Sequence, residues 1–171
     1  MNLSITPMPP NDWEAVLTIY REGIATGNAT FETQVPTWEI WDAAHHSFSR
    51  LVARIGADVV GWAALMPVSK RECYRGVADL SIYIASHARG QGVGKQLLPA
   101  LIQSSEENGI WTLQAGIFVE NTASIRLHEH CGFRLVGKHE RIGQLAGCWR
   151  DVLLLERRSS IVYPDLARAI N

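Results

Sequence analysis

Residues 77–107 constrain the fold most, because a strand, a glycine-rich turn and a helix follow one another without a gap. The run VADLSIYI (77–84) has the β-branched and aromatic residues typical of a strand. The stretch that begins at Val93 places apolar side chains on one helical face, namely Val93, Leu97, Leu98, Leu101 and Ile102. The turn RGQGVG (89–94) joins the two. Free backbone amides at a helix N-terminus bind anions, so the segment predicts an α/β unit with a phosphate site.

The glycine spacing in this turn excludes the two commonest nucleotide motifs. A dinucleotide fold needs G-x-G-x-x-G after its first strand, whereas the glycines here are Gly90, Gly92 and Gly94, past mid-chain. A P-loop would need glycine in place of Arg89 and serine or threonine in place of Gln96. The remaining pattern, R-x-x-G-x-G, suits a pyrophosphate, with Arg89 adding a cation; a turn without a ligand is the alternative.

The rest of the chain predicts one mixed α/β domain over residues 1–158, followed by a peripheral C-terminal tail, 159–171. Helices are expected over 11–25, with Asn11 or Asp12 as N-cap, and over 37–48 and 121–131. Strands are expected over 3–6, 111–119, 133–142 and 148–156, and a hairpin over 51–67. The segment 26–36 is a long polar loop, and KRECYRG (70–76) is a basic one.

Composition limits the class of partner. The net charge is −1, so a nucleic-acid partner is not expected. The N-terminal residues do not resemble a signal peptide, and no apolar run approaches the roughly 20 residues that span a membrane. The three cysteines and six scattered histidines form neither a disulfide framework nor a zinc motif. We therefore expect a cytoplasmic, metal-free protein that does not bind membranes.

Two further features carry candidate chemistry. Strand periodicity places Asp79, Ser81 and Tyr83 on one face, and aspartate is disfavoured inside strands. Asp79 could be a solvated charge at a sheet edge, it could pair with Arg71 or Arg75, or it could serve as a general base whose pKa is raised by burial. In ENTASIRLHEHCGF (120–133), Asn121 can cap a helix or offer its amide to an extended ligand, and His128 lies two turns further on.

Taken together, these motifs resemble the GNAT superfamily of acetyl-CoA-dependent N-acetyltransferases. The likeness is closest to the branch that acetylates phosphinothricin and methionine sulfoximine, through ATFETQVPT (29–37), KRECYRGVADLSIYI (70–84), residues 120–143 and GCWRDVLLLERR (147–158). It covers residues 3–158. The resemblance implies a central, twisted, mostly antiparallel sheet flanked by helices, acetyl-CoA as co-substrate, and no metal.

The resemblance also implies roles for individual residues. The pantetheine arm would pair with the backbone of Ile82, Tyr83 and Ile84, and Asn121 and Ser124 would contact the arm near the thioester. The pyrophosphate would lie on Arg89, Gly90, Gln91, Gly92, Val93, Gly94 and Lys95. Asp79 stands where the branch usually carries a glutamate that acts as general base. His128 stands where many relatives carry a tyrosine that protonates the departing thiolate.

For the acceptor, the resemblance implies a pocket that binds a small amino-acid analogue. Its lining would comprise Phe31, Glu32, Lys70, Arg71, Tyr74 and Ser81, with the cations holding the acidic groups and Asp79 facing the amine. About a tenth of an α-amine is free at pH 7, far more than of a lysine amine, so a modest base suffices. No cysteine is placed to carry the acetyl group, which predicts direct transfer. Such an enzyme would serve detoxification, including herbicide resistance.

Three alternatives stay open. A GNAT enzyme with this scaffold could acetylate a polyamine or a protein N-terminus instead. A protein that binds CoA without turnover would serve as a sensor.

The branch also implies a homodimer, to which Trp149 would contribute, although a tryptophan in a strand is more often a core residue.

Overall fold

All seven strands join one sheet in a computed structural model that describes residues 2–163. The strand order is β1-β2-β3-β4-β5-β7-β6, and every neighbouring pair is antiparallel except β4 and β5. The strands are β1 (Leu3–Pro7), β2 (Leu51–Ile55), β3 (Asp58–Pro67), β4 (Val77–Ile84), β5 (Thr112–Phe118), β6 (Arg134–Leu145) and β7 (Cys148–Arg158). The predicted mixed, mostly antiparallel sheet is confirmed.

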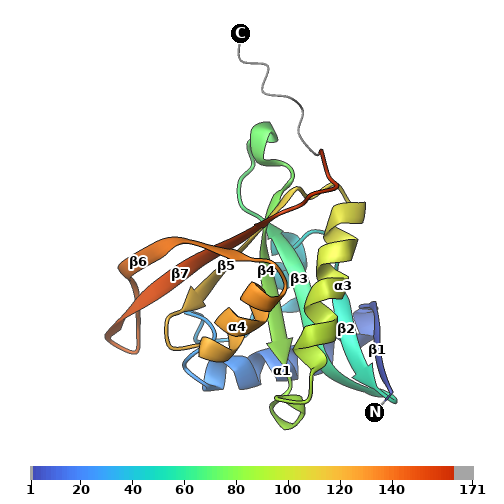
Figure 1. Cartoon of the computed structure of the whole chain (residues 1–171). Coiled ribbons are helices and arrows are strands. Elements are labelled where there is room, and N and C mark those ends of the chain that lie inside the picture. Colours follow the sequence, from blue (N-terminus) through green and yellow to red (C-terminus); the bar gives the residue numbers. More distant parts are fainter. Residues whose placement is uncertain (1, 164–171) are drawn as a thin grey trace.

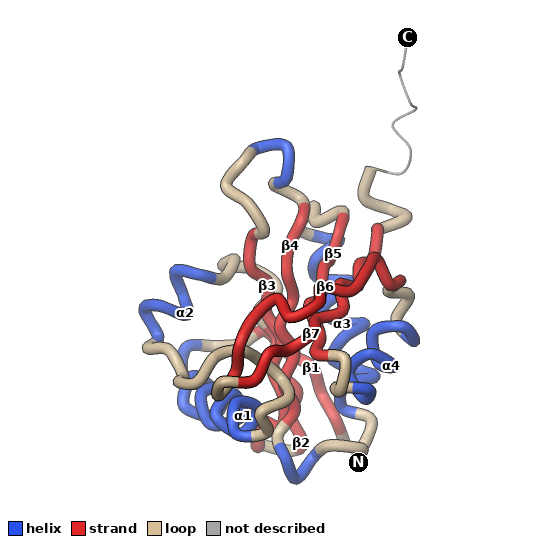
Figure 2. The backbone as a smooth tube through the Cα atoms, turned by 90° about the vertical axis from the view of Figure 1, so that its left-hand side faces the viewer, coloured by secondary structure: helices blue, strands red, loops and turns tan. Residues whose placement is uncertain are grey.

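Four helices cover the two faces of the sheet. Figure 2 shows α1 (Trp13–Ala25) and α2 (Trp38–Ala44) on one side, and α3 (Val93–Glu107) and α4 (Thr122–His130) on the other. The face of α3 predicted to be apolar is buried, and α1 buries Val16, Ile19 and Gly23. Because α3 connects β4 to β5, it makes the crossover that parallel neighbours require (Figure 1).

The N-caps of the helices agree only in part with those predicted from the sequence. Thr37 caps α2 by accepting a hydrogen bond from the backbone of Ile40, and Asn121 caps α4. Asp12 occupies the N-cap position of α1 as predicted, but its side chain makes no capping bond, since its carboxylate pairs with Arg54 of β2. The alternative cap, Asn11, lies within the short helical turn Pro10–Asp12.

The parallel pair β4 and β5 separates along its length. Their register covers only Val77 with Thr112, Ala78 with Leu113 and Asp79 with Gln114. Beyond Asp79, β4 pairs with β3 alone, and β5 pairs with β7 alone. Figure 1 shows the two strands diverging toward their carboxyl ends. A strand edge without a partner exposes backbone donors and acceptors, so the stretch Leu80–Ile84 can pair with an extended ligand.

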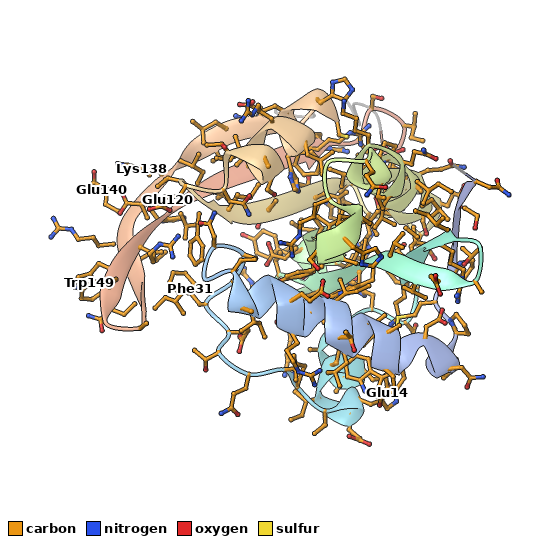
Figure 3. The ribbon with its side chains drawn as sticks, turned by 90° about the horizontal axis from the view of Figure 1, so that it is seen from below. Glu14, Phe31, Glu120, Lys138, Glu140 and Trp149 are labelled. Carbon is orange, nitrogen blue, oxygen red and sulfur yellow. The ribbon has the colours of Figure 1, made fainter. Side chains whose placement is uncertain are left out.

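The C-terminal region shows one correction to the sequence analysis. Trp149 is 57% exposed on the β6–β7 hairpin, together with Ile142 at 54%, so the core interpretation of Trp149 is wrong. Figure 3 shows Trp149 at the periphery of the molecule, on this hairpin. Of the predicted tail, residues 159–163 follow β7, and Arg158 holds them through the carbonyls of Val162 and Tyr163. Residues 164–171 lie outside the described part of the chain.

Candidate active site

Two neighbouring cavities lie where β4 and β5 diverge. The aspartate cavity, of about 410 Å³, is lined by Asp79, Ser81, His128, segment 29–32 and residues 115–118 of β5, among others. The glycine-turn cavity, of about 440 Å³, is lined by Arg89, Gly90, Gly92–Lys95 and Ile82–Ile84, among others. Ala29, Ile82, Tyr83, Asn121 and Ser124 line both cavities. A molecule long enough to reach from one cavity to the other would therefore pass along the unpaired edge of β4.

The glycine-turn cavity has the properties of an anion site. Gly90 and Gly92 have φ angles of 74° and 83°, a region that glycine occupies without strain. Gly92 is the N-cap of α3, so the first free amides of the helix open onto the turn. Arg89 and Lys95 add two cations to the lining. The side chain of Gln91 turns away, since its amide donates to the carbonyl of His87 at 2.7 Å.

Asp79 is the half-buried carboxyl group of the aspartate cavity. Its burial raises the pKa of this carboxyl above the ordinary value, because the charged form loses solvation. Neither arginine suggested by the sequence pairs with it. Arg75 forms a salt bridge with Glu72 at 3.2 Å, and Arg71 stacks over Tyr74. The ion-pair interpretation of Asp79 is therefore wrong, whereas an uncompensated carboxylate in a cavity is able to accept a proton.

His128 lies one turn beyond Ser124 on α4 and is 1% exposed. Its Nδ1 lies 2.8 Å from the backbone carbonyl of Ser124; a carbonyl only accepts, so Nδ1 carries a proton. Burial lowers the pKa of the ring, which is consequently neutral at pH 7. Nε2 then holds a lone pair, and it has no hydrogen-bond partner among the described residues. In this state His128 must gain a proton before it can act as an acid.

Asn121 joins helix α4 to the loop after α1. Its side-chain oxygen accepts from the amide of Ser124 at 3.2 Å, and its Nδ2 donates to the carbonyl of Asn28 at 3.2 Å. The cap interpretation of Asn121 is confirmed. Because Asn121 also lines both cavities, the same residue can contact an extended ligand.

The predicted acceptor residues fall into two groups. Phe31, Glu32 and Ser81 line the aspartate cavity. Lys70, Arg71 and Tyr74 are exposed and line neither cavity. Their segment projects beyond the sheet at the end where β7 finishes (Figure 1). The structure therefore places the two groups apart, and no lysine or arginine lines the described aspartate cavity.

Arg150 lies beside the site, and the sequence did not predict this. Arg150 of β7 contacts the loop at Gly27 and Asn28, which lies beside both cavities. Nothing in the sequence indicated this, since a single arginine in a strand most often faces solvent. The contact joins residues more than a hundred positions apart, and only the fold brings them together.

Three further features of the described residues concern metal-ligand groups, membrane-length helices and cysteines. Residues 2–163 contain no group of three or more histidine, cysteine or carboxylate side chains that could hold a metal ion. Within the same range, no helix is long and apolar enough to cross a membrane. Cys73, Cys131 and Cys148 are free thiols, and none of them lines either cavity.

Comparison with known proteins agrees with this geometry. Residues 13–133 match the acetyltransferase (GNAT) family. An L-methionine sulfoximine/L-methionine sulfone acetyltransferase of Pseudomonas paraeruginosa is 33% identical over 162 residues, 91% of this chain and 94% of that protein. A phosphinothricin acetyltransferase of Sinorhizobium meliloti, solved in complex with acetyl-CoA, is 28% identical with a TM-score of 0.85, over 97% of this chain and 98% of that one. A ribosomal-protein-alanine N-acetyltransferase of Brucella melitensis is 33% identical with the same TM-score, over 91% and 99%.

Proposed function

The chain belongs to the acetyltransferase (GNAT) family, and we propose that it acetylates the α-amino group of methionine sulfoximine, phosphinothricin or a related amino-acid analogue. That it is an acetyl-CoA-dependent N-acetyltransferase follows from the family and the relatives. The observation that carries the finer proposal is the junction of the two cavities at the free edge of β4. One cavity offers amides and cations to an anion, and the other offers a carboxyl group to an amine.

The residues present fit acetyl-CoA. Gly92 and the first turn of α3 would hold the pyrophosphate, with Arg89 and Lys95 as cations. The backbone of Ile82–Ile84 would pair with the pantetheine arm as an added strand, because β5 leaves that edge free. Asn121 and Ser124 would contact the arm where the cavities meet. The thioester would then lie beside the aspartate cavity.

The chemistry proposed for the aspartate cavity is a direct transfer. Asp79 accepts a proton from the ammonium group of the acceptor, and the freed amine nitrogen bonds to the acetyl carbon. The carbon–sulfur bond breaks, and the sulfur leaves as a thiol after gaining a proton. A neutral His128, with its lone pair on Nε2, can take the second proton of the nitrogen and return it to the sulfur. No cysteine lines the cavities, so an acetylated cysteine is not expected.

The acceptor's amine would face Asp79, and its side chain would contact Phe31, Glu32 and Ser81. Binding of the acceptor's carboxylate by Lys70, Arg71 and Tyr74 remains a prediction, and it requires the segment 70–76 to approach the cavity in the complex. The small size of the aspartate cavity favours a small acceptor over a folded protein. The acidic side chains Glu32 and Asp79 in its lining keep a polyamine as the second candidate acceptor.

The acceptor is tested by thiol release from acetyl-CoA over a panel of methionine sulfoximine, phosphinothricin, spermidine and a short peptide. We expect turnover with methionine sulfoximine or phosphinothricin and background rates with the other two. Turnover with spermidine or the peptide alone would keep the CoA site and overturn the acceptor. Binding of acetyl-CoA by calorimetry without turnover on any amine would favour the sensor.

We also propose that the protein forms a homodimer through the β6–β7 hairpin. Trp149 and Ile142 are apolar side chains more than half exposed on this hairpin, and burying such surface favours association. We expect light scattering to give the mass of a dimer for the unmodified protein and of a monomer for Trp149→Gln. Ile40→Gln, which alters a residue of α2 that is 63% exposed, serves as the control and should remain dimeric. A monomeric unmodified protein would refute the proposal.

A further inference from the structure

The segment of residues 27–32 forms a wall shared by the two cavities. Asn28 and Ala29 line the glycine-turn cavity, whereas Ala29–Glu32 line the aspartate cavity. The segment belongs to the irregular connection between α1 and α2, so no helix or strand ladder fixes its backbone. Besides short-range hydrogen bonds from Asn28 N–H to Thr26 Oγ1 and from Glu32 N–H to Thr30 Oγ1, its position depends on contacts with neighbouring elements.

Arg150 makes two side-chain hydrogen bonds to this segment, and Asn121 makes one. The Nη1 of Arg150 donates to the carbonyl of Gly27 at 2.7 Å, and its Nη2 donates to Oδ1 of Asn28 at 3.0 Å. The same Nη2 lies 3.0 Å from a carboxylate oxygen of Glu120, which precedes α4. Three groups from two separate segments therefore converge on one guanidinium.

The guanidinium of Arg150 also packs against an aromatic ring. Its central carbon lies 4.0 Å from the centroid of the Phe118 ring, at the end of β5. Phe31 of the segment contacts the same ring edge to face, with 4.8 Å between the centroids of the two rings. Arg150 and Phe31 therefore both contact the ring of Phe118. Figure 3 shows Phe31 lying toward the β6–β7 hairpin.

The chemistry of this contact suits arginine better than lysine. A planar guanidinium donates from a rigid fork while its flat face stacks on a ring, whereas a lysine ammonium is a compact point charge that cannot stack. The side chain of Arg150 is 15% exposed, but that of Glu120 is 56% exposed, so water screens much of the ion pair between them. The pairing also lowers the pKa of Glu120, which keeps the carboxylate charged.

We propose that Arg150 is a positioning residue that holds segment 27–32 against the sheet, so that Phe31 and Glu32 face the acceptor. Arg150 itself lines neither cavity, and it acts through the backbone of Gly27 and the side chain of Asn28. The inference rests on the proposed function only in that the ligand of the aspartate cavity is taken to be the acceptor. The restraint of segment 27–32 by Arg150 does not depend on the proposed function.

The test compares Arg150→Gln with Arg157→Gln, a matched variant on the same strand. Arg157 forms a 2.8 Å ion pair with Glu106 of α3 and makes no hydrogen bond to segment 27–32. We expect Arg150→Gln to raise KM for the acceptor by about tenfold to a hundredfold, because small displacements of binding groups carry effects of this size. Arg150→Lys should restore part of the loss, and Arg157→Gln should leave KM unchanged.

A second measurement does not depend on the acceptor. Glu32 is exposed, and a glutamate-specific protease cleaves after it when the segment opens. We expect cleavage after Glu32 to be several-fold faster in Arg150→Gln than in Arg157→Gln, at equal melting temperatures. Equal cleavage rates together with equal KM values in the two variants would overturn the proposal. If no amine of the panel is acetylated, the acceptor assignment fails, and the cleavage rates alone still decide the role of Arg150.

Discussion

Replacing Asp79 with asparagine is expected to lower kcat/KM by about 10²–10⁴-fold, the range typical of a lost general base. Asparagine keeps the shape of the side chain but cannot accept the proton of the acceptor's ammonium group. Asp79 lines the aspartate cavity and not the glycine-turn cavity, so the affinity for acetyl-CoA should change little. Steady-state kinetics and calorimetry on the same preparation measure the two effects separately.

The pH profile should report the same carboxyl group. Burial raises the pKa of Asp79, so the base is lost to protonation at a higher pH than an exposed aspartate would be. We expect kcat/KM to fall as the pH drops through this raised pKa. In Asp79→Asn, the residual activity should lack that step.

The same substitution should stabilise the fold at neutral pH. A carboxyl group whose pKa is raised on folding binds more protons in the folded state than in the unfolded state. Its favourable contribution is present below the unfolded pKa and is lost as the pH rises through the folded pKa. At pH 7 the buried charge of Asp79 is therefore unfavourable, and Asp79→Asn should raise Tm, whereas at pH 3 the two proteins should melt alike.

Asp151 provides the control with the opposite sign. The amide of Arg141 donates to this carboxylate at 2.8 Å, and Lys138 lies 3.3 Å away, so its pKa is lowered. Asp151→Asn should consequently lower Tm at pH 7, with its stabilising effect in the unmodified protein lost as the pH falls through the lowered pKa. It should retain activity, since Asp151 lines neither cavity. An Asp79→Asn enzyme with full activity would exclude Asp79 as the base.

The elements of this fold could be predicted from local patterns. Apolar periodicity identified α1 and α3, and the alternation along β4 placed Asp79, Ser81 and Tyr83 on one face. The glycine turn was predictable because positive φ angles at a helix start favour glycine. Each of these signals depends on residues within about two helical turns of one another.

The features that the sequence did not show depend on distant residues. The separation of β4 from β5 after Asp79 has no local signature, although residues of both strands line the aspartate cavity there. The resemblance implies that the basic loop contributes to the acceptor pocket, whereas in this structure the connection between β3 and β4, which includes residues 70–76, extends beyond the sheet (Figure 1). Trp149 looked like a core residue because strand position alone does not reveal which face a sheet edge exposes. The role of Arg150 could be recognised only in the folded structure, since its hydrogen-bond partners lie far away in the sequence, at Gly27 and Asn28.

The glycine turn gives the second large expected effect, in the binding of acetyl-CoA rather than in the chemistry. Gly92 has a φ of 83° and caps α3, and a Cβ added there would meet nothing within 4 Å. Alanine at this φ costs about 1–2 kcal/mol, and its methyl group would occupy the open space proposed for the pyrophosphate. We expect Gly92→Ala to raise the Kd for acetyl-CoA by about tenfold or more, measured by calorimetry.

Gly109, at the opposite end of the same helix, separates strain from binding. Its φ is 78°, and a Cβ there likewise meets nothing within 4 Å, so Gly109→Ala carries the same backbone penalty. Both variants should therefore melt roughly 2–8 °C lower than the unmodified protein. Only Gly92→Ala should weaken acetyl-CoA binding, because only its helix end presents free amides with Arg89 and Lys95 beside them. Equal Kd values in the two variants would show that the glycine turn does not hold the pyrophosphate, and acetyl-CoA would then have to reach the thioester position by another route along β4.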